Sequence, residues 1–173
     1  MDIRIVKLTE PTEEIAAAFT KWENNPTLIH LIRPHRTQKD LDRRFTITVE
    51  DLTQRQEHHV SYLILLDGQL VGEVDYQFDP PYLHKRDVRT AWLGIIIGEE
   101  TARGKGVGRQ AIQLLEVKLK QQGIPRIELG VFEFNTRALK LYQNLGYQEI
   151  GRIQDFTFWQ NRMWNDIRLE KYL

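Results

Sequence analysis

The alternation of apolar and polar residues predicts a strand, two helices and a hairpin in the first half of the chain. Residues 3–8 (IRIVKL) alternate as a strand, and residues 13–24 carry apolar side chains at helical spacing. A second helix is expected over residues 38–52, although β-branched residues weaken the pattern near its end. Residues 59–79 hold two β-rich runs on either side of an Asp-Gly dipeptide, which accommodates the positive φ of a tight turn. We therefore expect a two-stranded hairpin there.

The second half of the chain alternates strands and helices. The run RTAWLGIIIG (residues 89–98) is apolar on both faces, which is typical of a buried central strand. After a glycine-rich loop, apolar residues recur about every four positions from Val107 to Leu119 and predict a helix packed on a sheet. Strands are expected at 126–134, 147–159 and 162–173, and a helix at 135–146. This order predicts a mixed α/β sheet in a single domain spanning residues 1–173, and not a regular dinucleotide-binding fold.

The composition supports one folded domain and excludes several classes of protein. Hydrophobic residues make up 41% of the 173 residues and charged residues 28%, which disfavours disorder. No apolar run reaches the ~18 residues that cross a bilayer, and the first residues show no secretory signal, so we expect no membrane partner and a cytoplasmic location. Lys and Arg balance Asp and Glu at 24 each, so the broad positive field of a nucleic-acid-binding protein is absent.

Several catalytic chemistries lack their residues in this sequence. The chain has no cysteine, which excludes disulfides, thiolate metal ligands and a cysteine nucleophile. Ser61, the only serine, lies in a strand without the G-x-S-x-G turn of serine hydrolases. The five histidines show no metal-binding spacing, and His58 and His59 are expected at the surface. No metal site is therefore predicted.

The loop TARGKGVGRQ (residues 101–110) has the character of an anion site. A strand that runs through glycines into a helix exposes backbone N–H groups at the positive end of the helix dipole. The Walker motif requires four residues between its first glycine and Gly-Lys, whereas five follow Gly98, and Gly106 takes the place of the magnesium-binding hydroxyl. A dinucleotide-binding motif would need a glycine where Arg109 stands. The sequence therefore fits neither motif.

A third motif fits the loop: Arg or Gln, two residues, Gly, one residue, then Gly or Ala, at Arg103, Gly106 and Gly108. Here the sequence resembles the GCN5-related N-acetyltransferases (GNAT family), whose loop of this form binds the diphosphate of acetyl-CoA. Two flanking segments carry the rest of the resemblance: WLGIIIGEETARGKGVGRQAIQLL and VFEFNTRALKLYQNLGYQEIGR. Both ends of the chain look most like the branch that includes ribosomal-protein, spermidine and aminoglycoside N-acetyltransferases. The resemblance implies a single-domain α/β fold with a mixed, mostly antiparallel central sheet flanked by helices.

The resemblance implies that acetyl-CoA is the cosubstrate. Backbone N–H groups of the loop would hold the diphosphate, Lys105 and Arg109 would add charge, and the exposed edge of GIII would hydrogen-bond the pantetheine arm. Asn135 would bind the coenzyme or an ordered water, or would cap the following helix. The predicted coenzyme-binding residues are Ile95, Ile96, Ile97, Arg103, Gly104, Lys105, Gly106, Val107, Gly108, Arg109 and Asn135.

The reaction that the resemblance implies is direct acetyl transfer to a primary amine within a ternary complex. An alkyl amine with a pKa of ~10.4 must lose a proton before it attacks, and the departing CoA thiolate benefits from a proton donor. Tyr142 occupies the family's position for this donor, although its helical spacing is also that of a core residue. Many relatives carry a glutamate base where this chain has Trp92. We therefore choose Glu73 as the catalytic base, acting directly or through water, with Asp75 as its rival; otherwise both would form a solvent-exposed polar face.

The acceptor is a small amino compound, an aminoglycoside or a protein N-terminus under this resemblance. In the family, the first helices and the terminal hairpin surround the acceptor; here these parts contain Trp22, Arg33, His35, Arg36, Phe156, Phe158, Trp159 and Trp164, which would otherwise be core aromatics and surface bases. No acidic run that would suit a polycation is present, so a peptide α-amine or a small amino compound is slightly favoured. A homodimer is the family expectation. The alternative from another class is a noncatalytic acyl-CoA-binding regulatory module, motivated by Trp92 in place of the family's base.

Overall fold

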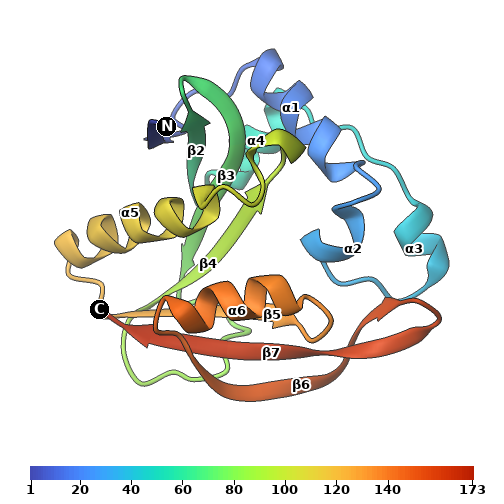
Figure 1. Cartoon of the computed structure of the whole chain (residues 1–173), viewed down its shortest axis with the longest axis vertical. Helices are drawn as coiled ribbons and strands as arrows, with labels where there is room; N and C mark the ends of the chain where they lie inside the picture. The colour runs from blue at the N-terminus through green and yellow to red at the C-terminus, as the bar shows by residue number, and fades with distance from the viewer.

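One seven-stranded sheet runs through the molecule, as seen in the computed structural model, which describes all of residues 1–173 (Figure 1). The strand order is β1-β2-β3-β4-β5-β7-β6. The strands are β1 Ile3–Lys7, β2 Val60–Leu66, β3 Gln69–Phe78, β4 Thr90–Ile97, β5 Arg126–Phe132, β6 Gln148–Trp159 and β7 Arg162–Tyr172. Every neighbouring pair is antiparallel except β4 and β5, which are parallel. The expected mostly antiparallel sheet is confirmed, with β4 at its centre.

Six α-helices and one short 3-10 turn accompany the sheet. They are α1 Glu13–Glu23, α2 Ile29–Ile32, α3 Gln38–Asp42, α4 Val49–Arg55, the turn η1 Glu100–Ala102, α5 Val107–Gln121 and α6 Thr136–Asn144. None of the helices combines the length and the hydropathy that a membrane span requires. The helices after the first strand, at the central loop and before the closing strands are confirmed.

The single helix expected over residues 38–52 is wrong, because two short helices occupy that stretch. Thr37 and Thr48 each begin a helix with a capping box, in which Asp40 and Asp51 respectively accept the reciprocal hydrogen bond. The β-branched stretch between α3 and α4 is not helical. Two capping threonines therefore outweighed the apolar spacing that suggested one continuous helix.

The sheet separates two hydrophobic cores. On one face α5 and α6 pack through side chains such as Ala111 and Leu115 onto Leu93 of β4 (Figure 1). On the other face a smaller core joins α1, the start of α2 and α4 to the sheet, with Trp22 among its buried residues. Because side chains alternate along a strand, Glu73, Asp75, Trp92 and Gly94 all lie on this other face, which we call the second face.

Strands β4 and β5 pair only at their beginnings. Three residue pairs join them, from Thr90 with Arg126 to Trp92 with Glu128, although β4 continues to Ile97. Beyond these pairs the two strands diverge (Figure 1), so the later main-chain groups of β4 have no strand partner on the β5 side. The centre of the sheet therefore presents an exposed strand edge that leads directly into the glycine loop.

Candidate active site

The glycine loop has the backbone geometry of an anion site. Gly104 and Gly106 adopt φ values of +76° and +80°, in the left-handed region that favours glycine. Gly106 is the N-cap of α5, and a Cβ on it would meet no atom within 4 Å. No side chain caps this helix and its first turn contains no acidic residue. The first N–H groups of α5 therefore face open space at the positive end of the helix dipole.

The side chain of Arg103 points away from this space and fixes the loop from behind. Its Nε donates to the carbonyl of Ile97 at 3.0 Å and its Nη2 to the carbonyl of Gly98 at 2.8 Å. Its Nη1 donates to Oγ1 of Thr27 at 2.9 Å, in the connection between α1 and α2. Val107 is buried in the core. These two predicted residues can therefore offer a ligand only their backbone groups.

Three other cations lie at the mouth of the loop. Lys105 and Arg109 are exposed and take part in no ion pair. Arg137 of α6, which the sequence did not single out, lies with Nη2 3.0 Å from the position that a Cβ on Gly104 would take. The loop thus combines free N–H groups with three nearby cations, Lys105, Arg109 and Arg137. Hydrogen-bond donors and positive charge are what binding of a diphosphate requires.

The isoleucines of β4 use their side chains for packing. Ile95 and Ile97 pack on the larger core, and Ile96 packs on the smaller one. Gly108, at the start of α5, faces Ile95 and Ile97 at ordinary van der Waals distance. What this strand leaves for a ligand is its unpaired main-chain edge.

Helix α6 places two further predicted residues near the divergence of β4 and β5. Asn135 is the N-cap of α6, and its Oδ1 accepts the N–H of Ala138 at 3.3 Å, which confirms the capping role. Tyr142 is 7% exposed and its hydroxyl makes no hydrogen bond within the chain. Because no fully buried side-chain nitrogen or oxygen lacks a partner, this hydroxyl must reach the surface. Burial raises the pKa of Tyr142 to about 12, so the phenol is protonated at neutral pH.

On the second face, Glu73 and Asp75 form one buried cluster with Arg55 of α4. Arg55 Nη1 donates to Oε1 of Glu73 at 2.6 Å, and its Nη2 donates to Oδ2 of Asp75 at 3.0 Å. Glu73 is 5% exposed, so the alternative of a solvent-exposed polar face is wrong. Burial and the neighbouring Asp75 raise the pKa of Glu73 to about 7, which Arg55 counteracts. A carboxyl group that titrates near neutral pH is suited to accept a proton.

Asp75 reaches from this cluster to the central strand. Its carboxylate lies across Gly94 of β4, where any Cβ would collide with Oδ1. His59 packs on the other side, with Nδ1 3.4 Å from Oδ2 of Asp75. His59 keeps 23% of its side chain exposed, so the expected surface position holds only in part. Burial, with Arg55, lowers its pKa to about 4, so the imidazole is neutral at pH 7.

Trp92 lies at the point where β4 and β5 separate. Its ring reaches across to Gly130 of β5, where a Cβ would collide with Asp166 and press on the indole. The Arg168 guanidinium lies 4.7 Å from the indole centre, and Tyr82 packs edge-on at 5.1 Å. The two glycines beside Trp92 thus leave room for carboxylates, Asp75 on one side and Asp166 on the other.

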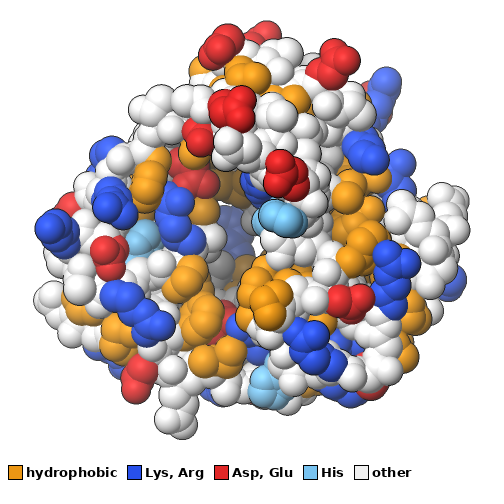
Figure 2. Space-filling view, turned by 180° about the vertical axis from the view of Figure 1, so that it is seen from behind, with side chains coloured by type: hydrophobic (Ala, Val, Ile, Leu, Met, Phe, Trp, Pro, Cys, Tyr) orange, Lys and Arg blue, Asp and Glu red, His pale blue; other side chains and the backbone are white.

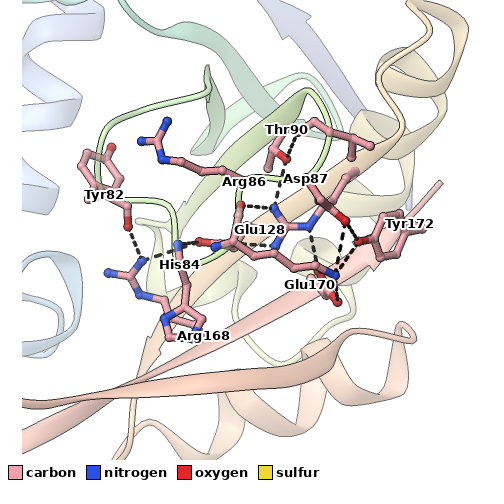
Figure 3. A network of polar contacts seen from close by, with 12 residues as sticks. Tyr82, His84, Arg86, Asp87, Thr90, Glu128, Arg168, Glu170 and Tyr172 are labelled. Atoms are coloured by element: carbon pink, nitrogen blue, oxygen red, sulfur yellow. Dashed lines mark hydrogen bonds and ion pairs between the residues drawn. The ribbon is translucent and has the colours of Figure 1, made fainter.

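A buried polar network holds the connection between β3 and β4 against the second face (Figure 3). Glu128 accepts the N–H groups of His84 and Lys85 at 2.7 and 3.1 Å and pairs with Arg126 at 2.7 Å. Arg168 donates to the carbonyl of Tyr82 at 2.8 Å, which fixes the ring that packs on Trp92. The sequence signal for this network was the charge at every second position of β5 and β7.

Figure 2 shows that the second face is hollowed near its centre and that charged side chains of both signs lie inside the hollow. Of the aromatic and basic residues expected around an acceptor, Trp22 and His35 are core residues instead: Trp22 is 1% exposed beneath Gly98, and His35 bonds to the carbonyl of Ile29 at 3.0 Å. Others form an aromatic group in which His30, which was not among those named from the sequence, stacks on Trp159 at 4.5 Å. The aromatic and basic residues expected around an acceptor are therefore divided between the core and an aromatic group formed by α2 and the β6–β7 hairpin.

The comparisons with known proteins agree with this geometry. The family model described as "Acetyltransferase (GNAT) family" matches residues 17–147. Mycothiol acetyltransferase of Jonesia denitrificans is 34% identical over 64% of this chain and 36% of that protein. The spermine/spermidine N(1)-acetyltransferase of Bacillus subtilis is 34% identical over 53% of this chain and 60% of that protein. The matched part is thus between about a third and three-fifths of the length of these relatives.

Solved structures share the whole fold. The spermidine N-acetyltransferase from Vibrio cholerae, in complex with CoA and spermine, superposes with a TM-score of 0.73 at 18% identity, covering 98% of this chain and 95% of that one. The ribosomal-protein-alanine N-acetyltransferase from Brucella melitensis gives 0.71 at 19% identity, covering 100% of both chains. At these identities the likeness concerns the fold.

Proposed function

The chain belongs to the GNAT family of acetyltransferases, and on that premise we propose that it transfers an acetyl group from acetyl-CoA to a primary amine by direct attack within a ternary complex. The observation that carries this proposal is the exposed edge of β4. Trp92 and Gly94 lie along this strand, and its end leads through the glycine loop to the uncapped start of α5. The relatives named above are acetyltransferases, which favours an enzyme over a noncatalytic coenzyme-binding module.

The residues of the donor side fit acetyl-CoA. The backbone N–H groups from Arg103 to Arg109 would bind the diphosphate, because Gly104 and Gly106 keep side chains out of the loop. Lys105, Arg109 and Arg137 would neutralise its charge. The free edge of β4 at residues 95–97 would hydrogen-bond the pantetheine arm as an added strand does. The bound thioester supplies the acetyl group, and CoA leaves as the thiol.

In the proposed reaction, groups on both faces of the sheet transfer protons: Glu73 and Asp75 on the second face, and Tyr142 on the other. The Glu73 and Asp75 pair would take a proton from the amine: Glu73 has the pKa for this step, and Asp75 lies closest to β4. Tyr142 would donate a proton or a hydrogen bond to the departing sulfur, and Asn135 would hold the coenzyme through its side-chain amide. Arg55 keeps the two carboxylates together and lowers the pKa of both.

The acceptor class, the homodimer and the cytoplasmic location belong to the proposal as well. A small amino compound, an aminoglycoside or a peptide N-terminus would each present the required primary amine, and some relatives are named for polyamines. Light scattering of the purified protein tests the dimer directly.

An acceptor screen tests the proposed function. The protein is incubated with acetyl-CoA and a panel of amines, thiol release is followed, and products are identified by mass spectrometry. We expect thiol release that depends on an amine, together with an acetylated product. Tight acetyl-CoA binding without acceptor-dependent thiol release for any amine would instead support the noncatalytic module.

A further inference from the structure

The segment of residues 33–44, which we call the basic segment, carries a cluster of positive charge beside the second face. It holds five Lys and Arg residues and two Asp residues, a net charge of +3. Both aspartates are engaged locally: Asp40 closes the capping box of α3 and Asp42 accepts a hydrogen bond from Gln38. Lys39 and Arg43 are exposed and take part in no ion pair. Figure 2 shows Lys and Arg side chains gathered on the left, over α2 and α3, beside the hollow.

Contacts near its start join the basic segment to the elements around the second face. Arg33 pairs with Glu23 of α1 and lies over the ring of Phe45 at 4.2 Å. His35 donates its N–H to Thr157 and its carbonyl accepts the N–H of Phe158, which ties the segment to β6. The start of the segment is therefore fixed between α1 and the β6–β7 hairpin.

The acidic groups of the second face are already paired with arginines inside the protein. Arg55 binds Glu73 and Asp75. The remaining pairs are Arg126 with Glu128 and Glu170, Arg168 with Asp166 and Glu128, and Lys85 with Glu170. Three arginines and one lysine thus meet five carboxylates, which leaves enough negative charge for one incoming ammonium group but not for a chain of them.

A cavity at the basic segment gives room for the rest of an acceptor. It has a volume of about 330 Å³ and lies between α2, α3 and the tip of β6. Its lining includes the stacked rings of His30 and Trp159, one cation, Arg44, and one carboxylate, Asp42. The lining carries one positive and one negative side chain, so it offers an ammonium group no net attraction.

Building on the proposed function, we infer that the acceptor is a compound with one primary amine whose remaining part is anionic or uncharged, as at the N-terminus of an acidic peptide, and not a polyamine. A polyamine would approach a segment of net charge +3 and would find the buried carboxylates bonded to arginines. An anionic tail would be attracted within the Debye length of about 8 Å at physiological salt. The inference separates this chain from the relatives named for spermine and spermidine.

A charge series of acceptors tests this inference. Three amidated tripeptides of equal length, Ala-Glu-Glu, Ala-Gln-Gln and Ala-Arg-Arg, each offer one α-amine, and spermidine is the fourth acceptor. We expect kcat/KM to fall from the acidic to the basic peptide by about tenfold, with spermidine slowest, and we expect added salt to compress the series. Spermidine as the fastest acceptor would overturn the inference and leave the proposed function standing. If none of the four is acetylated, the inference is overturned, and the wider amine screen then decides the proposed function.

Two charge-reversal variants locate the effect. In Lys39→Glu with Arg43→Glu the series should flatten or invert, since both side chains are exposed on the basic segment. The control, Lys7→Glu with Lys120→Glu, makes the same change in net charge at β1 and at the end of α5, and should leave the order intact. An unchanged order in the first variant, or a rise only in the KM for acetyl-CoA, would overturn the assignment of the segment to the acceptor.

Discussion

At the residue scale, the proposed proton transfers depend on Glu73 and Tyr142. Burial raises the pKa of both, which suits the first to accept a proton and the second to donate one. Burial raises the pKa of Glu73 to about 7, so near neutral pH it can both accept and release a proton. Burial raises the pKa of Tyr142 to about 12, so the phenol keeps its proton at neutral pH and can offer it as a hydrogen bond to a departing thiolate. The two groups lie on different elements, β3 and α6, and act on opposite sides of the thioester in the proposed reaction.

The pH dependence of activity distinguishes Glu73 from Asp75. The proposed base must be unprotonated, so kcat/KM should rise with pH through about 7. Glu73→Gln should lower kcat by about a hundredfold and remove this rise. Asp75→Asn should move the rise to lower pH, because the charge of Asp75 helps to raise the pKa of Glu73. Loss of activity in Asp75→Asn with a retained pH profile in Glu73→Gln would make Asp75 the base.

Tyr142→Phe tests the proton donor. The change removes one hydroxyl that has no partner in the protein and leaves the ring that packs edge-on against Tyr147 at 5.9 Å. We expect kcat to fall by about a hundredfold with little change in the Kd for acetyl-CoA, measured by calorimetry. Unchanged turnover would remove Tyr142 from the mechanism and leave it as a core residue.

At the scale of elements, the site depends on two strands that stop pairing and on a helix that begins without a cap. Three residue pairs hold β4 to β5, after which the edge of β4 is free, and α5 starts at Gly106 with its N–H groups open. Arg103 makes two hydrogen bonds to the end of β4 and one to Thr27 in the α1–α2 connection, so its side chain fixes the glycine loop to both. The loop is therefore preorganised before any ligand arrives.

Gly106→Val tests the loop. A side chain with a branched Cβ is strained at φ +80° and would stand in the space that a diphosphate needs, so acetyl-CoA affinity should fall at least about tenfold. Gly123→Val is the matched control, since Gly123 has φ +74°, has no atom within 4 Å of a Cβ and lies beyond the other end of α5. Both variants should lose similar stability, and only the first should lose affinity. Equal affinities by calorimetry would contradict the loop assignment.

Arg126→Met tests the network that anchors the β3–β4 connection. Arg126 and Glu128 are fully buried, and removing the arginine leaves Glu128 with only the more distant Arg168, at 3.6 Å, as a charged partner, so the free energy of unfolding should fall by about 3–5 kcal/mol. Adding Glu128→Gln should restore part of this loss, because the buried charge that lost its nearest partner is then gone. Urea denaturation measures both, and a loss below about 1 kcal/mol would show that the pair contributes little.

Sequence patterns predicted the elements whose causes are local and missed the contacts that depend on packing. The turn at Asp67 and Gly68, the glycine loop and the helix that Asn135 caps all follow from neighbouring residues, and all were predicted. The single helix over residues 38–52 was wrong because Thr37 and Thr48 each begin a separate helix, and Thr48 lies inside that stretch. Arg55 could not be paired with Glu73 from the sequence, since the contact requires α4 to lie against β3.

At the scale of the whole molecule, the sheet separates the proposed coenzyme side from the proposed acceptor side, and the two would meet where β4 and β5 diverge. The helices α5 and α6 cover one face and supply the loop and Tyr142, whereas α1 to α4 and the β3–β4 connection surround the other face and its carboxylates (Figure 1). An amine on the second face and a coenzyme on the β4 edge would therefore meet at Trp92 and Gly94. The order of elements predicted the fold. Which residues lie on which face of the sheet follows only from the register of the strands.

The direct transfer between two bound substrates is best tested by initial rates measured over a matrix of acetyl-CoA and amine concentrations, with the best acceptor from the screen. Because the proposed mechanism has no acetylated protein as an intermediate, we expect thiol release to require the amine and the double-reciprocal lines to intersect. Parallel lines, or thiol release at the same rate without an amine, would contradict direct transfer in a ternary complex.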